Sequence, residues 1–536
     1  MMRRSSFLIT SLGFLIMTSL TSAAESGKPI ASLEELRTLR KQASERQRRV
    51  IFNNDGNEPV YLCKDTSPEE LLGHRTAPLA GSQVDSLFYC TWSSGFGVFT
   101  HDTKVGQVMS SKEALFAKNL TSEMLAAGTD PLRVMTEFGH KNGMEVFWSF
   151  RMNDTHDGST AEYGPVMFRY NRLKNEHPEW LIGTPQQKPK FGAWSAVDFT
   201  RAEIRDLAFR YVEEVCQNYD VDGVELDFFR HPVFFKRAAV TGMECNDEER
   251  ALMTDLLLRI RTMTEAEGMK RGRPILVSVR VPDSVEYCRA IGLDLEHWLA
   301  DGLLDLLMPS GYFQLNEWSY SVALGHKHGV KAYPSLDESR VRDPAALKLR
   351  RSVQAYRGRA LAAWRVGADG VYLFNSFNPN NPVWRELGSP DTLASLDHDY
   401  FASIRGLGGA AGGSYPHADF VRIPVLNPAK PIAIKPGASA EVTFNAGDDS
   451  TLKSEARVTL RLQFKTAVPA EALTVNFNGS SLKKGTVKDH WLEFQVAPKN
   501  LKLGMNTVRL TLATKAKPIA WTDLHCTVRF PKEPTR

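Results

Sequence analysis

The stretch Asp222-Gly-Val-Glu225-Leu-Asp227-Phe-Phe-Arg230-His231 joins a short apolar run to charged side chains. A run of this length, with β-branched and aromatic residues, predicts a buried strand. Side chains two positions apart lie on the same face of a strand, so Glu225 and Asp227 point in the same direction. The stretch therefore predicts a strand of a parallel sheet that carries chemical groups at its carboxyl end.

Seven similar runs flank this strand, and helical patterns separate most of them. Alternation of strands and helices indicates βα units around a parallel sheet. Eight strands without a glycine-rich phosphate loop favour a closed barrel over an open doubly wound sheet. The predicted fold is therefore α/β, a (β/α)₈ barrel. The predicted strands are Val50–Asn53, Ser86–Thr91, Glu145–Arg151, Gly223–Phe228, Ile275–Val281, Leu304–Met308, Val330–Ser335 and Gly370–Asn375.

Both ends of the chain differ from the predicted barrel in composition and in hydrophobic pattern. A basic start, an apolar core at 7–20 and small residues after it are typical of a secretory signal peptide cleaved near Ala24. Beyond a Gly/Ala-rich stretch at 406–413, short alternating runs predict an antiparallel β-sandwich. The predicted domains are a signal peptide (1–24), an N-terminal helical extension (25–48), the catalytic barrel (49–405) and the β-sandwich (415–536).

Composition excludes several classes of protein. A net charge of +4, spread without a dense basic run, argues against a nucleic-acid partner. No later run reaches the ~20 apolar residues of a membrane span, so we expect a secreted or periplasmic protein. The six cysteines show no CxxC spacing and no neighbouring histidine cluster, which predicts no metal and no cofactor. Most of these cysteines are expected to be buried thiols, and the oligomeric state stays open.

The pair Glu225 and Asp227 is the predicted catalytic centre. In a (β/α)₈ barrel, the working residues lie at the carboxyl ends of the strands. Two neighbouring carboxylates raise each other's pKa, so that one donates a proton while the other stays ionised. The alternative is that Glu225 pairs with a buried arginine, such as Arg280, and only holds the barrel together. Arg230 and His231, which follow directly, favour the functional interpretation.

Other strand ends carry hydrogen-bonding groups and aromatic rings that suit a polyhydroxylated ligand. Asp154 and His156 follow the third strand as further possible partners. A third acid would come from Asp283, Asp337 or Glu338. His156, His101 and His140 lie on different segments, which argues against a metal triad. The predicted substrate-binding residues are Asn53, Asp55, Trp92, Trp148, Arg151, Asn153, Arg230, His231, Arg280, Tyr312 and Asn375.

The fourth-strand stretch resembles the DGxDxDxE motif of family 18 glycoside hydrolases up to its second-last acid. Phe229 stands where that family has its proton donor, so the family mechanism does not carry over. Leu226-Asp227 followed by His231 is also similar to the fourth strand of the α-amylase superfamily, in which this Asp is the nucleophile. Glu225 stands where that superfamily has an arginine.

A resemblance over the whole barrel is to secreted family-10-like putative glycoside hydrolases. It rests on the fourth-strand stretch together with Gly143-Met-Glu-Val-Phe-Trp148-Ser-Phe-Arg151, His177-Pro-Glu-Trp180 and Val197-Asp-Phe-Thr-Arg-Ala-Glu203-Ile-Arg205. The resemblance implies a carbohydrate-active barrel and names no substrate.

These observations predict an exported glycoside hydrolase that cleaves a poly- or oligosaccharide by carboxylate catalysis at the barrel mouth. Two residues that lie two positions apart on a strand are separated by ~6.5–7 Å at the backbone. This distance lies between the carboxyl separations of retaining and inverting enzymes, so the stereochemistry stays open. One alternative is a carbohydrate-binding barrel that has lost catalysis. Another is a polysaccharide lyase, in which Arg151, Arg230 and Arg280 would neutralise a uronate.

Overall fold

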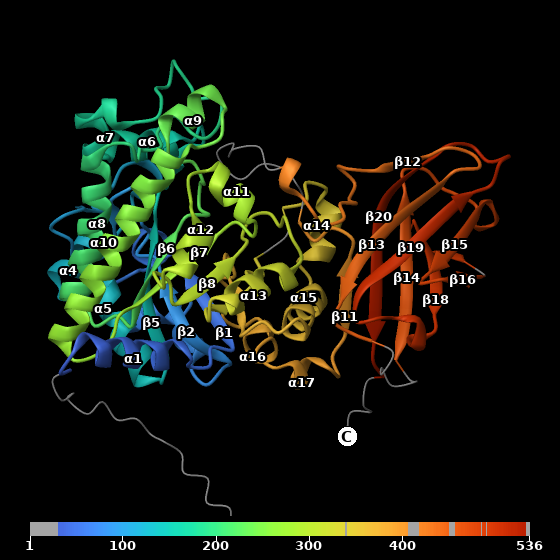
Figure 1. Ribbon diagram of the computed structural model, residues 1–536, viewed down its shortest axis with the longest axis horizontal. Coiled ribbons are helices and arrows are strands. Elements are labelled where there is room, and N and C mark those ends of the chain that lie inside the picture. The colour runs from blue at the N-terminus through green and yellow to red at the C-terminus, as the bar shows by residue number, and fades with distance from the viewer. Residues whose placement is uncertain are drawn as a thin grey trace, which may run out of the picture.

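The computed structural model describes residues 30–337, 340–405, 418–449, 456–483, 485–488 and 490–531. The predicted signal peptide, Glu338 and the Gly/Ala-rich stretch at 406–413 lie outside these residues. The described chain forms a helix-covered parallel sheet followed by antiparallel sheets at its C-terminal end (Figure 1).

All eight predicted barrel strands are confirmed. They form one parallel sheet in the order β10-β1-β2-β5-β6-β7-β8-β9. A parallel bridge between Ser335 and Tyr372 joins the two edges, and the Tyr372 amide donates to the carbonyl of Pro334 (3.0 Å). The strands are β1 (Val50–Asn54), β2 (Val84–Tyr89), β5 (Glu145–Arg151), β6 (Gly223–Asp227), β7 (Leu276–Val281), β8 (Leu306–Pro309), β9 (Lys331–Ala332) and β10 (Val371–Leu373).

Helices cover the outside of the sheet, and several begin and end at recognisable caps. Helix α10 begins with a capping box between Asn246 and Glu249 and ends at Gly272, which has a left-handed backbone. The helices are α1 (Leu33–Ser44), α2 (Glu58–Tyr61), α3 (Pro68–Gly73), α4 (Thr121–Ala126), α5 (Pro131–Lys141), α6 (Tyr163–Tyr170), α7 (Arg172–Glu176), α8 (Ala202–Asn218), α9 (Lys236–Thr241), α10 (Asp247–Arg271), α11 (Val285–Ala290), α12 (Leu295–Ala300), α13 (Trp318–Lys327), α14 (Pro344–Arg350), α15 (Val353–Arg365), α16 (Val383–Glu386) and α17 (Pro390–Leu393).

The two ends of the barrel differ. Helix α1 lies at the bottom of Figure 1, at the end where the barrel strands begin, and its Arg37 pairs with Glu265 of α10. The loops that hold α6, α7 and α9 lie at the top, where β5 and β6 end. This upper end is where barrel enzymes carry their chemistry.

The C-terminal strands form two antiparallel sheets, as the alternating runs predict. One sheet has the order β11-β20-β14-β18-β17 with β12 beside β20, and the other has the order β13-β19-β15-β16. The strands are β11 (His398–Phe401), β12 (Ile432–Ile434), β13 (Ser439–Ala446), β14 (Arg457–Phe464), β15 (Leu473–Phe477), β16 (Ser480–Leu482), β17 (Thr486–Lys488), β18 (Trp491–Val496), β19 (Gly504–Leu512) and β20 (Ile519–Arg529). Strand β11 falls within the range 49–405 assigned to the barrel, yet it pairs with β20.

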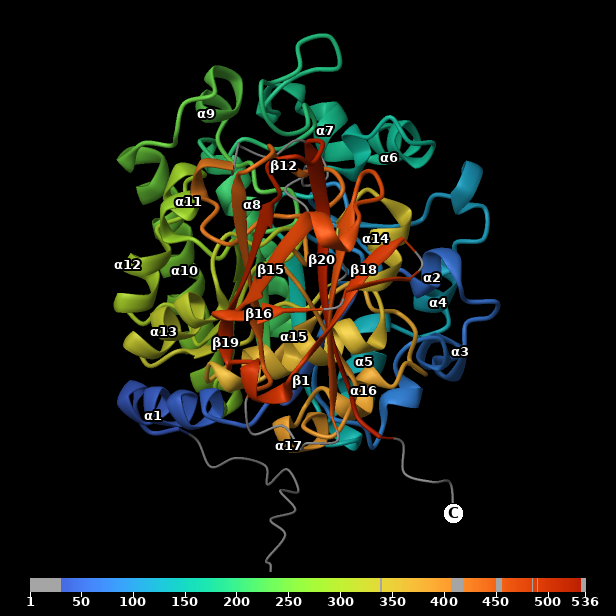
Figure 2. The same cartoon turned by 90° about the vertical axis from the view of Figure 1, so that its right-hand side faces the viewer.

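A buried ion pair ties these sheets to the barrel helices. Arg350 at the end of α14 donates from both Nη atoms to Asp523 of β20 (2.8 and 2.7 Å), and neither side chain is exposed. Its Nε donates to the carbonyl of Ser403 (2.7 Å). Figure 2 shows the antiparallel sheets lying over one side of the barrel.

The cysteines are buried free thiols, as the sequence predicts: Cys63, Cys90, Cys216, Cys245, Cys288 and Cys526. Within the part of the chain that the structure describes, no helix is both long and apolar enough to cross a membrane.

Candidate functional site

Asp227 ends β6 and is held by Arg280 of the neighbouring strand. The two residues are register partners, and Arg280 donates from Nε and Nη2 to the two carboxylate oxygens (3.0 and 2.9 Å). The Asp227 side chain is 1% exposed and the Arg280 side chain is not exposed at all. Asp227 Oδ1 also accepts from the amides of Phe229 and Arg230 (both 3.0 Å). The Asp227 carboxylate thus forms a buried ion pair and also stabilises the turn that follows β6.

Glu225 lies one layer deeper in the barrel and is fully buried. Its Oε2 accepts from Ser149 Oγ, from Asn53 Nδ2 (3.2 Å) and from the Tyr372 hydroxyl (3.1 Å). Burial, and then the charge of Asp227, raise the pKa of Glu225 to about 7. Glu225 therefore keeps its proton to a higher pH than an ordinary glutamate does, and Arg280 pairs with Asp227 rather than with Glu225.

We expect Glu225→Gln to flatten the pH dependence of stability. In the folded protein the pKa of Glu225 is about 7, which lies above the ordinary glutamate value. As the pH rises, Glu225 therefore loses its proton in the unfolded chain before it does so in the folded protein. The parent loses stability as the pH rises between the two pKa values, by about 3 kcal/mol from this group. Urea unfolding at pH 4.5 and pH 8 measures the difference.

The control for this experiment is Glu69→Gln, because Glu69 is an exposed carboxylate on α3. This variant should retain the pH dependence of the parent. Equal pH dependence in Glu225→Gln and the parent would contradict the assignment.

Asp55 and Arg151 meet across the barrel mouth from the ends of β1 and β5. Arg151 Nη2 donates to Asp55 Oδ1, and Arg151 Nη1 donates to the carbonyl of Trp92 (3.1 Å). Burial alone would raise the pKa of Asp55, but the charges of Arg151 and Arg230 lower it. The Asp55 side chain is 15% exposed. The mouth therefore presents an ionised carboxylate that solvent can reach.

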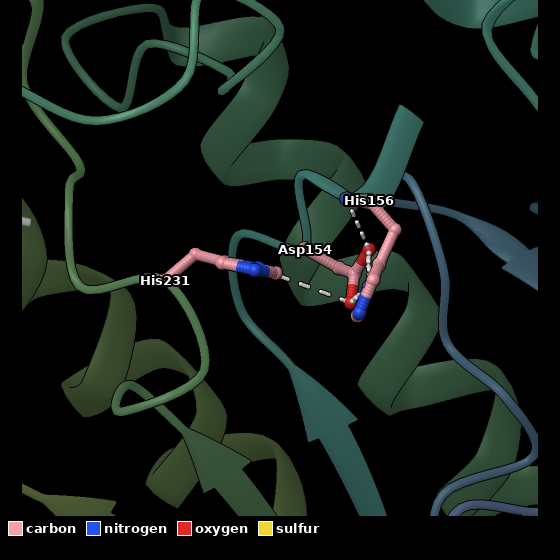
Figure 3. Close-up of side chains that lie close together, drawn as sticks. All are labelled: Asp154, His156 and His231. Carbon is pink, nitrogen blue, oxygen red and sulfur yellow. Dashed lines mark hydrogen bonds and ion pairs between the residues drawn. The ribbon is translucent and has the colours of Figure 1, made fainter. Parts of the chain in front are cut away.

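Asp154, His156 and Arg230 form a hydrogen-bonded line beside this carboxylate (Figure 3 shows the first two with His231). His156 Nδ1 lies 2.9 and 2.7 Å from the Asp154 oxygens, and Arg230 Nη2 donates to His156 Nε2. A carboxylate on one side and a guanidinium on the other require a proton on Nδ1 and a lone pair on Nε2. The His156 side chain is 20% exposed, so the ring is oriented as a base at the edge of the mouth.

Asp154 is kept ionised by its surroundings. Burial alone would raise its pKa, but the interaction with His156, including its Nδ1 hydrogen bond, and the charge of Arg151 hold it well below its usual range. Asp154 Oδ1 also accepts from the amide of Gly95 (3.0 Å), and the side chain is fully buried. An ionised, fixed Asp154 holds the His156 ring in one orientation.

His231 completes the cluster from the turn after β6. Its Nδ1 accepts from the amide of Thr155 (3.0 Å) and lies 4.0 Å from Asp154 Oδ2. Burial holds the pKa of His231 well below its usual range, so the ring is neutral.

The ligand-type atoms of Asp154, His156 and His231 lie within 4.8 Å of one another, a grouping that the sequence analysis did not predict. Arg151 Nη1 approaches Asp154 Oδ2 (3.6 Å), and Arg230 faces His156 Nε2. Two guanidinium groups at these positions oppose a divalent cation. The cluster fits a proton-transfer network better than a metal centre.

A cleft of about 360 Å³ opens beside this cluster. His156 and His231 line it together with Tyr163, Lys188 and Trp194. The rings of Tyr163 and Trp194 are partly exposed, and Lys188 is exposed. Aromatic walls with a few polar groups are usual for small-ligand sites. Tyr163, Lys188 and Trp194 were not predicted from the sequence, because they lie in the long connection between β5 and α8, away from any strand end.

Several predicted binding residues are held by contacts within the protein, on strand β5 and in the loops after β2 and β5. Trp148 is fully buried, and its Nε1 donates to Thr91 Oγ1 (2.9 Å). Asn153 Nδ2 donates to the carbonyls of Val197 and Val233 (3.0 and 2.6 Å). Trp92 packs edge-on against Tyr61 and Phe116. The contacts of these three residues are structural.

The remaining predicted residues divide between the mouth and its surroundings. Tyr312 lies at the mouth, where its ring is 5.1 Å from the guanidinium carbon of Arg230. Asn375 follows β10 with a left-handed backbone (φ 57°). Asp283 accepts from the amides of Leu315 and Asn316 (each 3.0 Å) and so fixes a loop. Asp337 is fully buried against Arg405 (3.0 Å). Neither acid is free to act as a third carboxylate in this arrangement.

Comparison with known proteins finds a family match within the barrel. Residues 77–250 match the model of the family described as glycosyl hydrolase-like 10. This segment, less than half of the chain, holds β2, β5 and β6 with Asp154, His156, Asp227, Arg230 and His231. The match confirms the resemblance to glycoside-hydrolase-like barrels inferred from the sequence.

Among curated proteins, the chain is 26% identical over 163 residues to an S-layer-related protein of Niallia circulans. The alignment covers 28% of this chain, and the chain spans only 10% of the length of that relative.

Two solved structures are similar at low TM-scores. Alpha-L-fucosidase isoenzyme 2 from Paenibacillus thiaminolyticus has a TM-score of 0.38 and 15% identity, over 65% of this chain and 49% of its own. The glycoside hydrolase domain of PgaB (BpsB) from Bordetella bronchiseptica has a TM-score of 0.40 and 11% identity, over 64% of this chain and 98% of its own.

Proposed function

We propose that the chain is a glycoside hydrolase whose substrate binds in the cleft at the carboxyl ends of β5 and β6. The observation that carries the proposal is the Asp154–His156 pair, which borders a cleft with the partly exposed rings of Tyr163 and Trp194. The match of residues 77–250 to a glycosyl hydrolase-like family supports the same chemistry.

The groups at the mouth can supply proton transfer and charge stabilisation. Once bound substrate draws the Arg230 N–H away from it, His156 Nε2 accepts the proton of a water as the water oxygen bonds to the anomeric carbon and the glycosidic C–O bond breaks. The leaving oxygen takes its proton from solvent. Asp154 fixes the ring through Nδ1. The ionised Asp55 stabilises the positive charge that develops on the sugar in an oxocarbenium-like transition state. Solvent exposure of Asp55 and His156 makes them accessible for these roles.

Asp227 and Glu225 then act as positioning residues. Asp227 holds Arg280 and the amide of Arg230, and so fixes the turn that presents Arg230 and His231. Glu225 packs beneath it with a hydrogen bond from Tyr372. Their burial, at 1% and 0% exposure, separates them from a substrate in the cleft.

We expect Trp194→Ala to weaken substrate binding while the chemical step is preserved. Loss of a ring that stacks on a sugar costs about 0.5–1.5 kcal/mol, so KM should rise roughly 2- to 12-fold with little change in kcat. The control is Trp180→Ala, because Trp180 stacks on His177 (3.8 Å) and does not line the cleft. A large fall in kcat with unchanged KM would contradict this role.

Incubation with a panel of oligosaccharides and polysaccharides, followed by assay of new reducing ends and mass spectrometry, tests the proposed activity. Release of shorter glycans supports it. Binding of a glycan with no product from any member of the panel would favour the alternative of a carbohydrate-binding barrel.

A further inference from the structure

Arg230 differs from the other two arginines of the mouth in having no carboxylate partner. Arg151 pairs with Asp55, and Arg280 pairs with Asp227. Among the described residues, no carboxylate oxygen lies within 4.0 Å of the Arg230 guanidinium, which has a hydrogen bond only to His156. Its Nε is buried without a partner in the same part of the chain. A guanidinium has five N–H donors, so most of those of Arg230 remain available.

Arg230 is a half-buried residue whose guanidinium keeps its positive charge. Burial, and then the charge of Arg151, lower the pKa of Arg230 to about 10, which still leaves it charged at neutral pH. The rings of Tyr312 and Phe374 lie 5.1 and 5.9 Å from its guanidinium carbon. These rings replace water around the guanidinium, and the carboxylates that act on its charge, Asp154 and Asp55, do not contact it directly, so a bound anion would supply a direct partner.

The position of Arg230 connects it to the cleft. Its contact with His156 places the guanidinium beside the ring that we assign to proton transfer. His156 and His231, the residue that follows Arg230, both line the cleft, and Lys188 on the cleft wall adds a second exposed positive charge. A group bound by Arg230 would therefore belong to the sugar that reacts.

We propose that Arg230 binds an anionic substituent, a carboxylate or a sulfate, on the sugar unit held next to His156. This inference rests on the proposed function and narrows its substrate class to acidic glycans. The planar fork of an arginine binds oxyanions by paired N–H···O contacts, which are stronger than neutral hydrogen bonds.

The test measures binding of three oligosaccharides of equal length: a uronic-acid oligomer, a sulfated oligomer and a neutral oligomer. Parent, Arg230→Gln, Arg230→Lys and Arg172→Gln are compared by calorimetry at fixed ionic strength. Arg172 is an exposed arginine on α7 and controls for general charge. We expect the parent to favour one acidic oligomer over the neutral one, and the preferred acid identifies carboxylate or sulfate as the group.

In Arg230→Gln this preference should fall about 10- to 150-fold, since hydrogen bonds to charged groups contribute about 1.5–3 kcal/mol. Arg230→Lys keeps the charge and should lose part of the preference, and Arg172→Gln should keep all of it. Near-ultraviolet circular dichroism checks that each variant is folded. Arg230→Lys supplies the test if Arg230→Gln does not fold.

Equal binding of all three oligomers by the parent, or an unchanged preference in both Arg230 variants, would overturn the inference. Hydrolysis of a neutral glycan by the same protein would then leave the proposed function standing. Conversely, the parent could prefer an acidic oligomer in an Arg230-dependent manner and yet release unsaturated products that absorb in the ultraviolet. That result would support the anion site at Arg230 and would show that the reaction is a lyase reaction instead of hydrolysis.

Discussion

We expect replacement of His156 with glutamine to lower kcat by a factor of about 10²–10⁴, the usual contribution of a general acid–base group. In the parent, Asp154 and Arg230 contact the two ring nitrogens of His156. A glutamine side chain can still form hydrogen bonds to both residues, but it cannot exchange a proton with the substrate or with water. KM should change little, because the cleft walls remain in place. Steady-state kinetics on the substrate found in the glycan panel measures both constants.

The matched control is His326→Gln. His326 also pairs with an aspartate, through Nε2 and Asp369 (2.8 Å), but it lies on α13 and is 45% exposed. The control should retain the activity of the parent. If kcat falls less than threefold in His156→Gln, His156 does not act as the acid–base group.

We expect Asp227→Asn to destabilise the protein by about 3–5 kcal/mol, because it leaves the charge of Arg280 buried and uncompensated. Turnover should fall as well, since Asp227 fixes the backbone that carries Arg230. Guanidinium unfolding measures the stability of parent and variant.

The double variant Asp227→Asn/Arg280→Met separates the structural role of the pair from its functional role. It removes both charges, while the asparagine oxygen can still accept from the amides of Phe229 and Arg230. Replacing both members of a buried ion pair is often neutral, so most of the lost stability should return. Recovery of stability without recovery of turnover fits the account. If Asp227→Asn is as stable as the parent, the assignment of Asp227 and Arg280 as a buried ion pair is wrong.

The barrel was predictable because its strands are buried and appear as nearly continuous apolar runs. Strand β5, Glu145–Arg151, has the bounds predicted for it, and β1 differs by one residue at its end. Strand β9 is shorter than its apolar run, Val330–Ser335, because only Lys331 and Ala332 pair with β8. The antiparallel pairing of β11 had no signal of its own, since its partner β20 lies more than a hundred residues further along the chain.

The site was predictable only in part. The rule that chemistry lies at strand ends named Asp55, Arg151, Arg230 and Tyr312, and the structure brings Asp55 against Arg151 and Arg230 against Tyr312. It could not select the partner of Arg280, because that choice depends on the register of β6 against β7. The cluster of Asp154, His156 and His231 joins the loops after two adjacent strands, β5 and β6, and strand adjacency was the signal that could have revealed it.

The most direct test of the central claim is product analysis of the glycan panel in water enriched in ¹⁸O, with the parent and His156→Gln side by side. We expect shorter glycans with ¹⁸O at the new reducing end in the parent, and at least a hundredfold less product in His156→Gln. Equal product formation by the two proteins, or a parent that binds a glycan and cleaves none, would contradict it.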